Sequence, residues 1–249
     1  MPLPIRFLTL TPIFIFCGHA LAEGGPPVIG DDPGTPGANH WEINIAYVGL
    51  RSIRQSSVET PHVDLNYGLG EHIQLKYEVG YLTGTELDRR EETGINNSLF
   101  GVKWRFLDEE KNGVDMSTYP QVYVNTYHSL ARAGLVDRGA DVYLPIEIAK
   151  TFGAWEPDAE LGYQWSQFGD NQFLGGFILG YKATEKVELV GEIRAAIDDN
   201  FRRTEVILDG GTRIAITDNA ALIAAAGRSV RTDSQSVTLC LYAGCRITF

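Results

Sequence analysis

Cysteine is scarce in this chain, with three in 249 residues, and none of them suggests a disulfide or a metal site. Cys17 lies in an apolar N-terminal stretch. Cys240 and Cys245 are an odd number of positions apart, which places them on opposite faces of one extended strand and about 16 Å apart. That distance exceeds the span of a disulfide. No CxxC pair or Cys/His cluster with zinc spacing occurs, so we expect no metal centre and no cofactor.

Long apolar runs and basic residues are also in short supply. After the N-terminal stretch, no segment approaches the run of about 18 apolar residues that indicates a membrane helix. The mean hydropathy of −0.11 likewise excludes a helical inner-membrane protein. Lysine and arginine number 21 against 32 aspartate and glutamate, for a formal net charge of −11. This acidic balance argues against nucleic acid as a partner, but not against a membrane.

Residues 1–22 predict a secretory signal peptide. Arg6 supplies a positive charge, an apolar stretch follows, and Ala20-Leu-Ala forms an A-x-A cleavage pattern. The stretch is shorter than the roughly 20 residues of a transmembrane helix, which disfavours an anchor. A lipoprotein signal at Cys17 is disfavoured because bulky Phe16 stands where a small residue is normally required.

Residues 23–38 are punctuated by proline and glycine, which excludes a helix or the interior of a strand. We therefore expect an N-terminal arm that lies in the periplasm, ahead of a single folded domain over residues 39–249. Asp31 and Asp32, like other paired carboxylates of the chain, are interpreted as solvated charge, with a loose calcium contact to lipopolysaccharide as the alternative.

From residue 39 onward, apolar residues alternate with polar or small ones. The first such segment places Trp41, Ile43, Ile45 and Tyr47 on one face, and Glu42, Asn44 and Ala46 on the other. A helical period of about 3.6 would scatter the charged residues around an axis, whereas a period of two sorts them onto one face. The alternation therefore predicts strands that each have one apolar face.

The alternation recurs in about twelve segments, which share residues 39–249 at roughly 18 residues each. The segments are Trp41–Tyr47, Val63–Tyr67, Ile73–Tyr81, Phe100–Phe106, Met116–Val124, Val142–Ile148, Leu161–Trp165, Phe173–Tyr181, Val187–Ile193, Val206–Ile214, Ala220–Arg228 and Val237–Phe249. That allotment suits a membrane-spanning strand and its connection. We predict an all-β fold, a transmembrane antiparallel up-and-down β-barrel of about 12 strands.

Short connections alternate with longer, polar ones. The short ones are Gly68–His72, Asp108–Gly113, Phe152–Glu156, Ala183–Lys186 and Thr217–Asn219, and the longest of the others are Thr83–Gly94 and Tyr127–Gly139. Outer-membrane barrels have short periplasmic turns and longer outer loops. We therefore expect a protein of the outer membrane of a Gram-negative-type bacterium, with both barrel termini in the periplasm.

Two other β folds are less consistent with the pattern. Strands of a soluble sandwich average about five or six residues, whereas several segments here alternate for longer and have aromatics near their ends. A periplasmic lipocalin-like barrel needs only eight strands and would end about 70 residues earlier. The chain instead finishes in an apolar strand with a terminal aromatic, Phe249. We expect Phe249 to be the signal read by the barrel-assembly machinery, and lipid and lipopolysaccharide to surround the barrel.

Several stretches resemble a family of bacterial outer-membrane proteins labelled as phenol meta-pathway degradation or outer-membrane transporter-like proteins. The matching residues are Gly34-Thr-Pro-Gly, His40-Trp-Glu-Ile-Asn, Asp64-Leu-Asn-Tyr-Gly-Leu-Gly, Gln74-Leu-Lys-Tyr-Glu, Asn97-Ser-Leu-Phe-Gly-Val-Lys-Trp-Arg-Phe and Glu147-Ile-Ala-Lys-Thr-Phe-Gly. The resemblance extends from about Asp32 to the end of the chain. It implies an outer-membrane barrel with a lean toward transport of small organic, including aromatic, compounds, and it carries over no catalytic or binding residue.

If the apolar faces turn to lipid, the opposite faces line the lumen and supply a possible solute path. The charged residues on these faces are Glu42, Asp64, Lys76, Glu78, Lys103, Arg105, Glu147, Glu160, Glu188, Glu192, Arg194, Glu205, Asp209, Arg213 and Arg246. Such groups can line a water-filled pore or pair with one another and close it. We favour a narrow channel for small solutes, with a closed structural barrel as the alternative. The nine carboxylates outnumber the six basic groups, which favours cations.

An outer-membrane lipid hydrolase is a second alternative, because such enzymes use a Ser/His pair on the lipid-facing wall of a barrel. The candidates are His128 with Ser129, and His62. His128 and Ser129 are neighbours in an expected outer loop, where their side chains diverge, and the spacing supplies no third group to orient the histidine. We therefore expect no catalytic residues.

Overall fold

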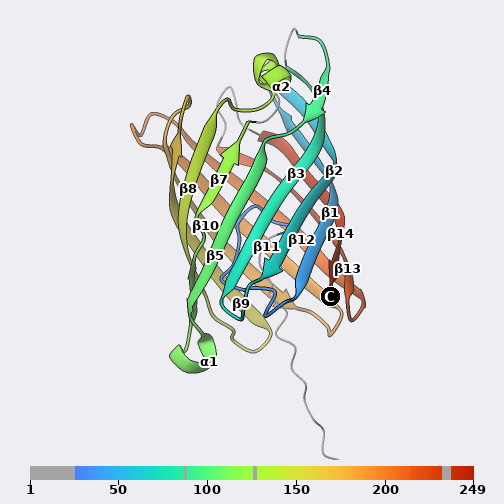
Figure 1. Cartoon of the computed structure of the whole chain (residues 1–249), viewed down its shortest axis with the longest axis vertical. Helices are drawn as coiled ribbons and strands as arrows, with labels where there is room; N and C mark the ends of the chain where they lie inside the picture. The colour runs from blue at the N-terminus through green and yellow to red at the C-terminus, as the bar shows by residue number, and fades with distance from the viewer. Residues whose placement is uncertain (1–25, 87–88, 126–127, 232–236) are drawn as a thin grey trace, which may run out of the picture.

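The computed structural model describes residues 26–86, 89–125, 128–231 and 237–249. The expected signal peptide, residues 1–22, lies outside the described residues. Within them, the chain forms a barrel of tilted strands with one short helix at each end (Figure 1).

Fourteen strands of the described residues join into one antiparallel sheet. In chain order the elements are β1 (Trp41–Ser52), β2 (Gln55–Gly68), β3 (Ile73–Glu86), β4 (Glu92–Ile95), β5 (Ser98–Leu107), α1 (Glu109–Asn112), β6 (Asp115–Thr118), β7 (Gln121–Val124), α2 (His128–Ala133), β8 (Ala140–Ala149), β9 (Trp155–Ser166), β10 (Gln172–Lys182), β11 (Val187–Asp198), β12 (Thr204–Thr217), β13 (Ala220–Arg231) and β14 (Val237–Thr248). Both β4 and β5 pair with β3, and both β6 and β7 lie between β5 and β8, so each of these pairs of strands is one interrupted spanning strand. The prediction of an all-β antiparallel barrel of about twelve strands is confirmed.

Pairing of β1 with β14 closes the barrel. The register runs from Glu42 opposite Thr248 at one end to Ser52 opposite Val237 at the other. At its start, Trp41 donates its N–H to the carbonyl of Phe249 at 2.7 Å, and Phe249 donates in return at 3.1 Å. Closure removes the free strand edge, whose backbone groups would otherwise find no partner in lipid.

The two ends of the barrel differ (Figure 1). We call the end that carries Phe249 and α1 the turn end, and the end that carries α2 and β4 the loop end. The prediction of a long loop over Thr83–Gly94 is wrong, because β3 and β4 extend into this segment and Thr83 pairs with Thr93. These β-branched residues favour continued pairing. The expected loop Tyr127–Gly139 contains α2.

One predicted strand is interrupted by a proline. Met116–Val124 divides into β6 and β7 at Tyr119 and Pro120, because proline has no N–H to donate to the ladder. The carbonyl of Pro120 still accepts from the N–H of Val102 at 3.0 Å. The Tyr119 ring turns into the barrel and is fully buried.

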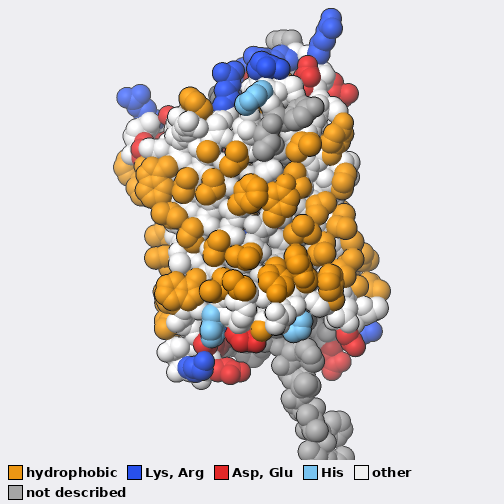
Figure 2. Space-filling model, viewed as in Figure 1, with side chains coloured by type: hydrophobic (Ala, Val, Ile, Leu, Met, Phe, Trp, Pro, Cys, Tyr) orange, Lys and Arg blue, Asp and Glu red, His pale blue; other side chains and the backbone are white. Residues whose placement is uncertain are grey.

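Apolar side chains cover the outside of the barrel. Leu161, Ile146 and Val102 are 67%, 54% and 48% exposed, and Figure 2 shows a broad apolar belt between charged ends. A belt this large is stable only against lipid or another apolar surface. None of the helices among the described residues is long and apolar enough to cross a membrane.

Aromatic pairs border this belt near both ends. Trp41 and Tyr67 at the turn end have ring centroids 4.8 Å apart, and Trp155 with Tyr181 4.4 Å apart. Near the loop end, Tyr163 contacts both Trp165 and Phe173. Rings with one apolar and one polar edge are typical of the two membrane interfaces.

Residues 26–36, which we call the plug, lie inside the barrel (Figure 1). Val28 packs against Ile178 and Val190 of the wall, and Pro33 is fully buried. We expected this part of the arm in the periplasm, and that placement is wrong. The inner wall carries charged and polar groups that need partners, and the plug supplies them.

The interpretation of Asp31 and Asp32 as solvated charge is wrong for the same reason. The side chain of Asp31 is 16% exposed, and Asp32 is 6% exposed. Both residues belong to the plug and face lumen side chains.

We predict that Val102→Arg destabilises the barrel by about 2–4 kcal/mol, because Val102 faces outward near mid-strand and the charge would enter hydrocarbon. Phe106 lies on the same face but one residue from the end of β5. Placing the charge there, with Phe106→Arg, should therefore destabilise the barrel by only about 0–1 kcal/mol. Urea unfolding in lipid vesicles measures both. Equal costs would show that depth in a membrane does not govern this face.

We predict that Phe249→Ala lowers the yield of folded barrel in cells much more than it lowers the stability of barrel already folded. The hydrogen bonds between Phe249 and Trp41 use main-chain atoms and survive the substitution, whereas the exposed ring is lost. Heat-modified mobility of membrane fractions measures the yield, and urea unfolding measures the stability. An unchanged yield would contradict an assembly role for Phe249.

Candidate functional site in the barrel lumen

Strand alternation places all fifteen predicted lumen residues on the inner face. Lys103, Glu147 and Glu192 are at most 3% exposed, whereas Val102 and Ile193, next to two of them in the chain, are 48% and 47% exposed and face outward. Their role as a solute path stays a prediction.

Most of the basic groups pair with carboxylates on other strands of the wall. The pairs are Arg194 with Glu160 at 2.8 Å, Arg213 with Glu188 at 2.9 Å, Arg246 with Glu42 at 3.3 Å, and Lys76 with Asp64 at 3.4 Å. A buried ion is tolerated only when its partner and further hydrogen bonds replace water. The wall is therefore largely neutralised by cross-strand pairs.

Two of the predicted residues, Arg105 and Glu205, lie toward the ends of the barrel, whereas Glu78 and Asp209 lie nearer the middle of their strands. Arg105 donates to the carbonyl of Glu71 at 3.1 Å at the turn end. Glu205 accepts from the Ser229 hydroxyl and from the N–H of Val237 near the loop end. Glu78 lies between Lys76 at 3.4 Å and His62 at 3.7 Å. Asp209, in mid-strand, is the register partner of Glu192.

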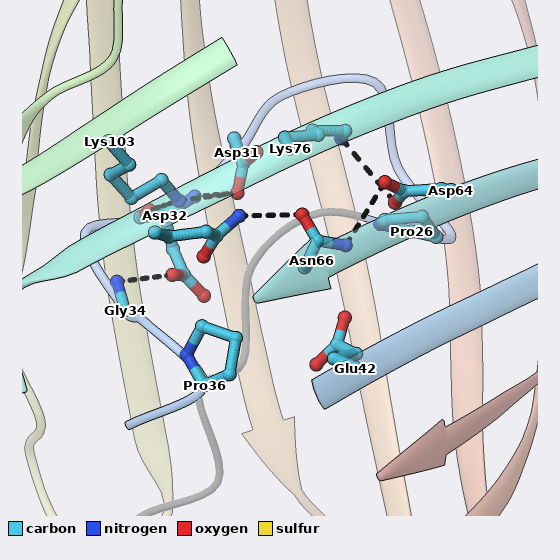
Figure 3. A pocket seen from close by; sticks show the side chains of 11 residues that line it. Pro26, Asp31, Asp32, Gly34, Pro36, Glu42, Asp64, Asn66, Lys76 and Lys103 are labelled. Atoms are coloured by element: carbon cyan, nitrogen blue, oxygen red, sulfur yellow. Dashed lines mark hydrogen bonds and ion pairs between the residues drawn. The ribbon is translucent and has the colours of Figure 1, made fainter. Parts of the chain in front are cut away.

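Lys103 on β5 connects the wall to the plug (Figure 3). Its ammonium lies 2.9 Å from the Asp31 carboxylate, donates to the main-chain carbonyl of Asp32 and lies 3.8 Å from Glu147. The Tyr119 ring lies beneath it at 4.7 Å from the ring centroid, a cation–π contact. Two of its three oxygen partners belong to the plug, so its charge is balanced mainly by residues outside the barrel wall.

Glu192 on β11 holds the plug from the opposite side of the lumen. Its carboxylate accepts the N–H groups of Ile29 at 2.8 Å and Gly30 at 3.0 Å. A Cβ at Gly30 would lie 2.9 Å from Oε1 of Glu192 and from Cδ1 of Ile178. A larger residue at this position would therefore require the ends of these two side chains to shift.

Two arginines hold the start of the plug. Arg213 and Arg246 each donate to the carbonyl of Pro26 at 3.2 Å, while also pairing with wall carboxylates. At the other end of the plug, the Thr35 hydroxyl donates to the carbonyl of Glu71 at 2.8 Å. The plug is thus held at both ends and in the middle, mainly by polar contacts.

Two small cavities lie beside the plug. The larger cavity, about 20 Å³, lies between the plug and β1–β5 and is lined by Asp31, Asp32, Glu42, Asp64, Asn66 and Lys103 among others (Figure 3). The second, about 10 Å³, lies between Asp32 and the wall of β9–β11. A site of about 10–15 Å³ holds a single water. Each of these two cavities is therefore large enough for about one water.

Several inner residues were not among the fifteen predicted for the solute path. Asn44, Asn66 and Gln74 connect the wall around Asp64 through hydrogen bonds, for example Gln74 to Asn66 at 2.7 Å. Strand alternation places them on the polar face, but the predicted solute path included only charged groups. Asp158 could also have been found, because it lies two residues before Glu160 on the same face of β9.

The structure does not bring the hydrolase candidates together on the lipid-facing wall of the barrel. His62 lies on the inner face of β2, 3.0 Å from Glu59, so it faces the lumen and not lipid. His128, at the start of α2, lies 3.2 Å from the amide oxygen of Asn125. Among the described residues, no group of three or more His, Cys, Asp or Glu side chains has the arrangement of a metal centre.

Comparisons with known proteins place the fold among outer-membrane β-barrels. No family model matches the chain, and no curated protein matches it. The outer membrane channel of the COG4313 group from Pseudomonas putida F1 is similar in structure, with a TM-score of 0.72 and 12% identity over 89% of this chain and 100% of that chain. The NanC porin has a TM-score of 0.56 and 8% identity over 84% of this chain and 98% of its own. At such identities the likeness shows the fold, that of an outer-membrane β-barrel.

The fold is not confined to solute channels. The translocator domain of the autotransporter NalP from Neisseria meningitidis has a TM-score of 0.55 and 12% identity over 86% of this chain and 89% of its own. The comparisons do not support the label of a phenol degradation pathway.

We predict that Glu192→Gln loosens the plug, because one acceptor oxygen for the plug N–H groups is lost. A hydrogen bond to a charged group contributes about 1.5–3 kcal/mol, so the displaced population should rise roughly tenfold to a hundredfold. Maleimide labelling of Val28→Cys, in a chain without its native cysteines, measures this population. Glu205→Gln is the control, since its described hydrogen-bond partners Ser229 and Val237 lie outside the plug. Equal labelling of Val28→Cys in the otherwise unchanged chain, in Glu192→Gln and in Glu205→Gln would contradict the role of Glu192 in holding the plug.

Proposed function

We propose that the protein is an outer-membrane channel for small solutes that is closed at rest by the plug. The observation that carries the proposal is a lumen lined by charged groups and filled by a segment held mainly through hydrogen bonds and ion pairs. Such polar contacts can be exchanged for water, at the cost of exposing the small apolar cluster of Val28, Ile178 and Val190. Similarity in fold to a protein described as an outer membrane channel supports this function.

The outer membrane is the environment that suits this barrel. The apolar belt and its aromatic borders fit a bilayer. The turn end, with its short connections and Phe249, faces the periplasm, and the loop end with α2 faces outward. The plug therefore enters the lumen from the periplasmic end.

Small cations are the favoured solutes once the plug is displaced. The inner face carries nine predicted carboxylates against six basic groups, and Asp158 adds a further carboxylate. Excess negative charge lowers the barrier for cations in a narrow pore. The resemblance to the phenol-pathway family favours small organic compounds among the solutes.

A closed structural barrel is the second candidate, and the water-sized cavities favour it. In that case the plug is a permanent part of the core. The two candidates differ in whether removal of the plug opens a conducting path.

Planar-bilayer recording separates these candidates. We predict discrete, cation-selective conductance steps, larger and more frequent when residues 26–36 are replaced by a Gly/Ser segment of equal length. Neutralising the less buried carboxylates, with Glu78→Gln and Glu205→Gln, should shift the reversal potential toward anions by removing negative charge from the path.

Heat-modified mobility verifies that each protein is a folded barrel before recording. Electrical silence of both the wild-type and the plug-replaced barrels would contradict the channel and leave the structural barrel. Release of fatty acid from phospholipid by the same preparations, lost in Ser129→Ala, would indicate the hydrolase instead.

A further inference from the structure

The second cavity is a carboxylate site between the plug and the wall, which we call the Asp32–Asp158 cavity. Asp32 contributes from the plug and Asp158 from β9, and Ile178, Val190 and Gly180 close it on the side of β10 and β11. Its volume is about 10 Å³. A space of this size holds one water or one small ion, and no larger solute.

Both aspartates present buried oxygens without a hydrogen-bond partner in the described part of the chain. Asp158 is 4% exposed, and neither of its carboxylate oxygens is hydrogen-bonded. Asp32 is 6% exposed; one of its oxygens accepts from the N–H of Gly34, and the other, Oδ2, has no such partner. Native proteins rarely leave buried polar atoms without a partner, and each exception requires an explanation.

The neighbouring cations are already engaged elsewhere. Lys103 binds the Asp31 carboxylate and the main-chain carbonyl of Asp32. Arg213 pairs with Glu188, which also borders the cavity. Asp32 and Asp158 line the same cavity, and among the described residues neither carboxylate forms an ion pair with a cationic side chain, which is costly in a buried place.

We propose that Asp32 and Asp158 together bind one divalent cation, Mg²⁺ or Ca²⁺, which connects the plug to the barrel wall. Carboxylate oxygens are the preferred ligands of these hard cations, and sites with one or two carboxylates are completed by water. The site has two primary side-chain ligands, one on each side of the cavity, and so differs from a metal centre built of three or more clustered side chains.

The cation stabilises the closed position of the plug. Lys103, Glu192 and the two arginines hold the plug from other sides. On β9 the cavity is lined by the carboxylates of Asp158 and Glu156, which repel Asp32 unless a cation lies between them. Binding of the ion does not depend on solute passage, so the inference goes beyond the proposed channel.

Urea unfolding of purified, lipopolysaccharide-free barrel in detergent tests the site, with Ca²⁺ or Mg²⁺ compared with NaCl of equal ionic strength after treatment with EDTA. For the wild type we expect a saturable stabilisation, with the unfolding constant reduced about 100-fold at a free cation concentration of about 100 times Kd. Asp158→Asn and Asp32→Asn should each abolish it. Isothermal titration with CaCl₂ gives the stoichiometry, expected to be one ion per chain.

Asp141→Asn is the matched control. Asp141 is also buried on the inner face but is hydrogen-bonded to Ser166 and Gln164. It lies eight positions from Ala149, the register partner of Asp158, or about 26 Å along the strand at 3.3 Å per residue. This variant should keep the full cation effect.

Three outcomes would overturn the site: no saturable effect in the wild type, an undiminished effect in Asp158→Asn, or equal loss in Asp141→Asn. If Asp158→Asn fails to fold, Asp32→Asn decides, because its substitution lies in the plug and outside every barrel strand. The absence of conductance in planar bilayers would contradict the proposed channel, but it would not affect the test of the cation site.

Discussion

The charge of Lys103 has to be neutralised inside the barrel, and the arrangement of the lumen follows from how this is done. The side chain is 1% exposed, and its ammonium is held by Asp31, by the carbonyl of Asp32 and, at greater distance, by Glu147. An unpaired ammonium at such a place would cost several kcal/mol. The plug therefore contributes to the charge balance of the wall, which helps to explain why a segment rich in proline and glycine has a defined position there.

Two wall arginines bind the plug and also have carboxylate partners on the wall. Arg213 pairs with Glu188 on the neighbouring strand and uses a further N–H to bind the carbonyl of Pro26. Arg246 divides its hydrogen bonds in the same way between the wall and Pro26. If the plug leaves, these two groups keep their carboxylates and water replaces one hydrogen bond each. Lys103 is the exception, since most of its partners leave with the plug.

The strands could be predicted because lipid and lumen impose opposite demands on successive residues. Val102 is 48% exposed and Lys103 is 1% exposed, and this contrast, repeated along each strand, produces the period-two pattern. The plug could not be predicted, because its contacts join residues such as Ile29 and Glu192, which are 163 positions apart, and no periodicity marks them. Asp158 was missed because Pro157 precedes it, and a proline is easily interpreted as the end of a strand.

Four main-chain groups of the plug contact the wall: the carbonyls of Pro26 and Asp32 accept from wall cations, and the N–H groups of Ile29 and Gly30 donate to Glu192. Main-chain atoms are the same in every residue except for the missing N–H of proline. The wall therefore recognises a path of the chain more than a set of side chains. Substitutions in the plug that keep this path should therefore preserve these main-chain contacts, whereas a substitution at Asp31 removes the carboxylate that binds Lys103.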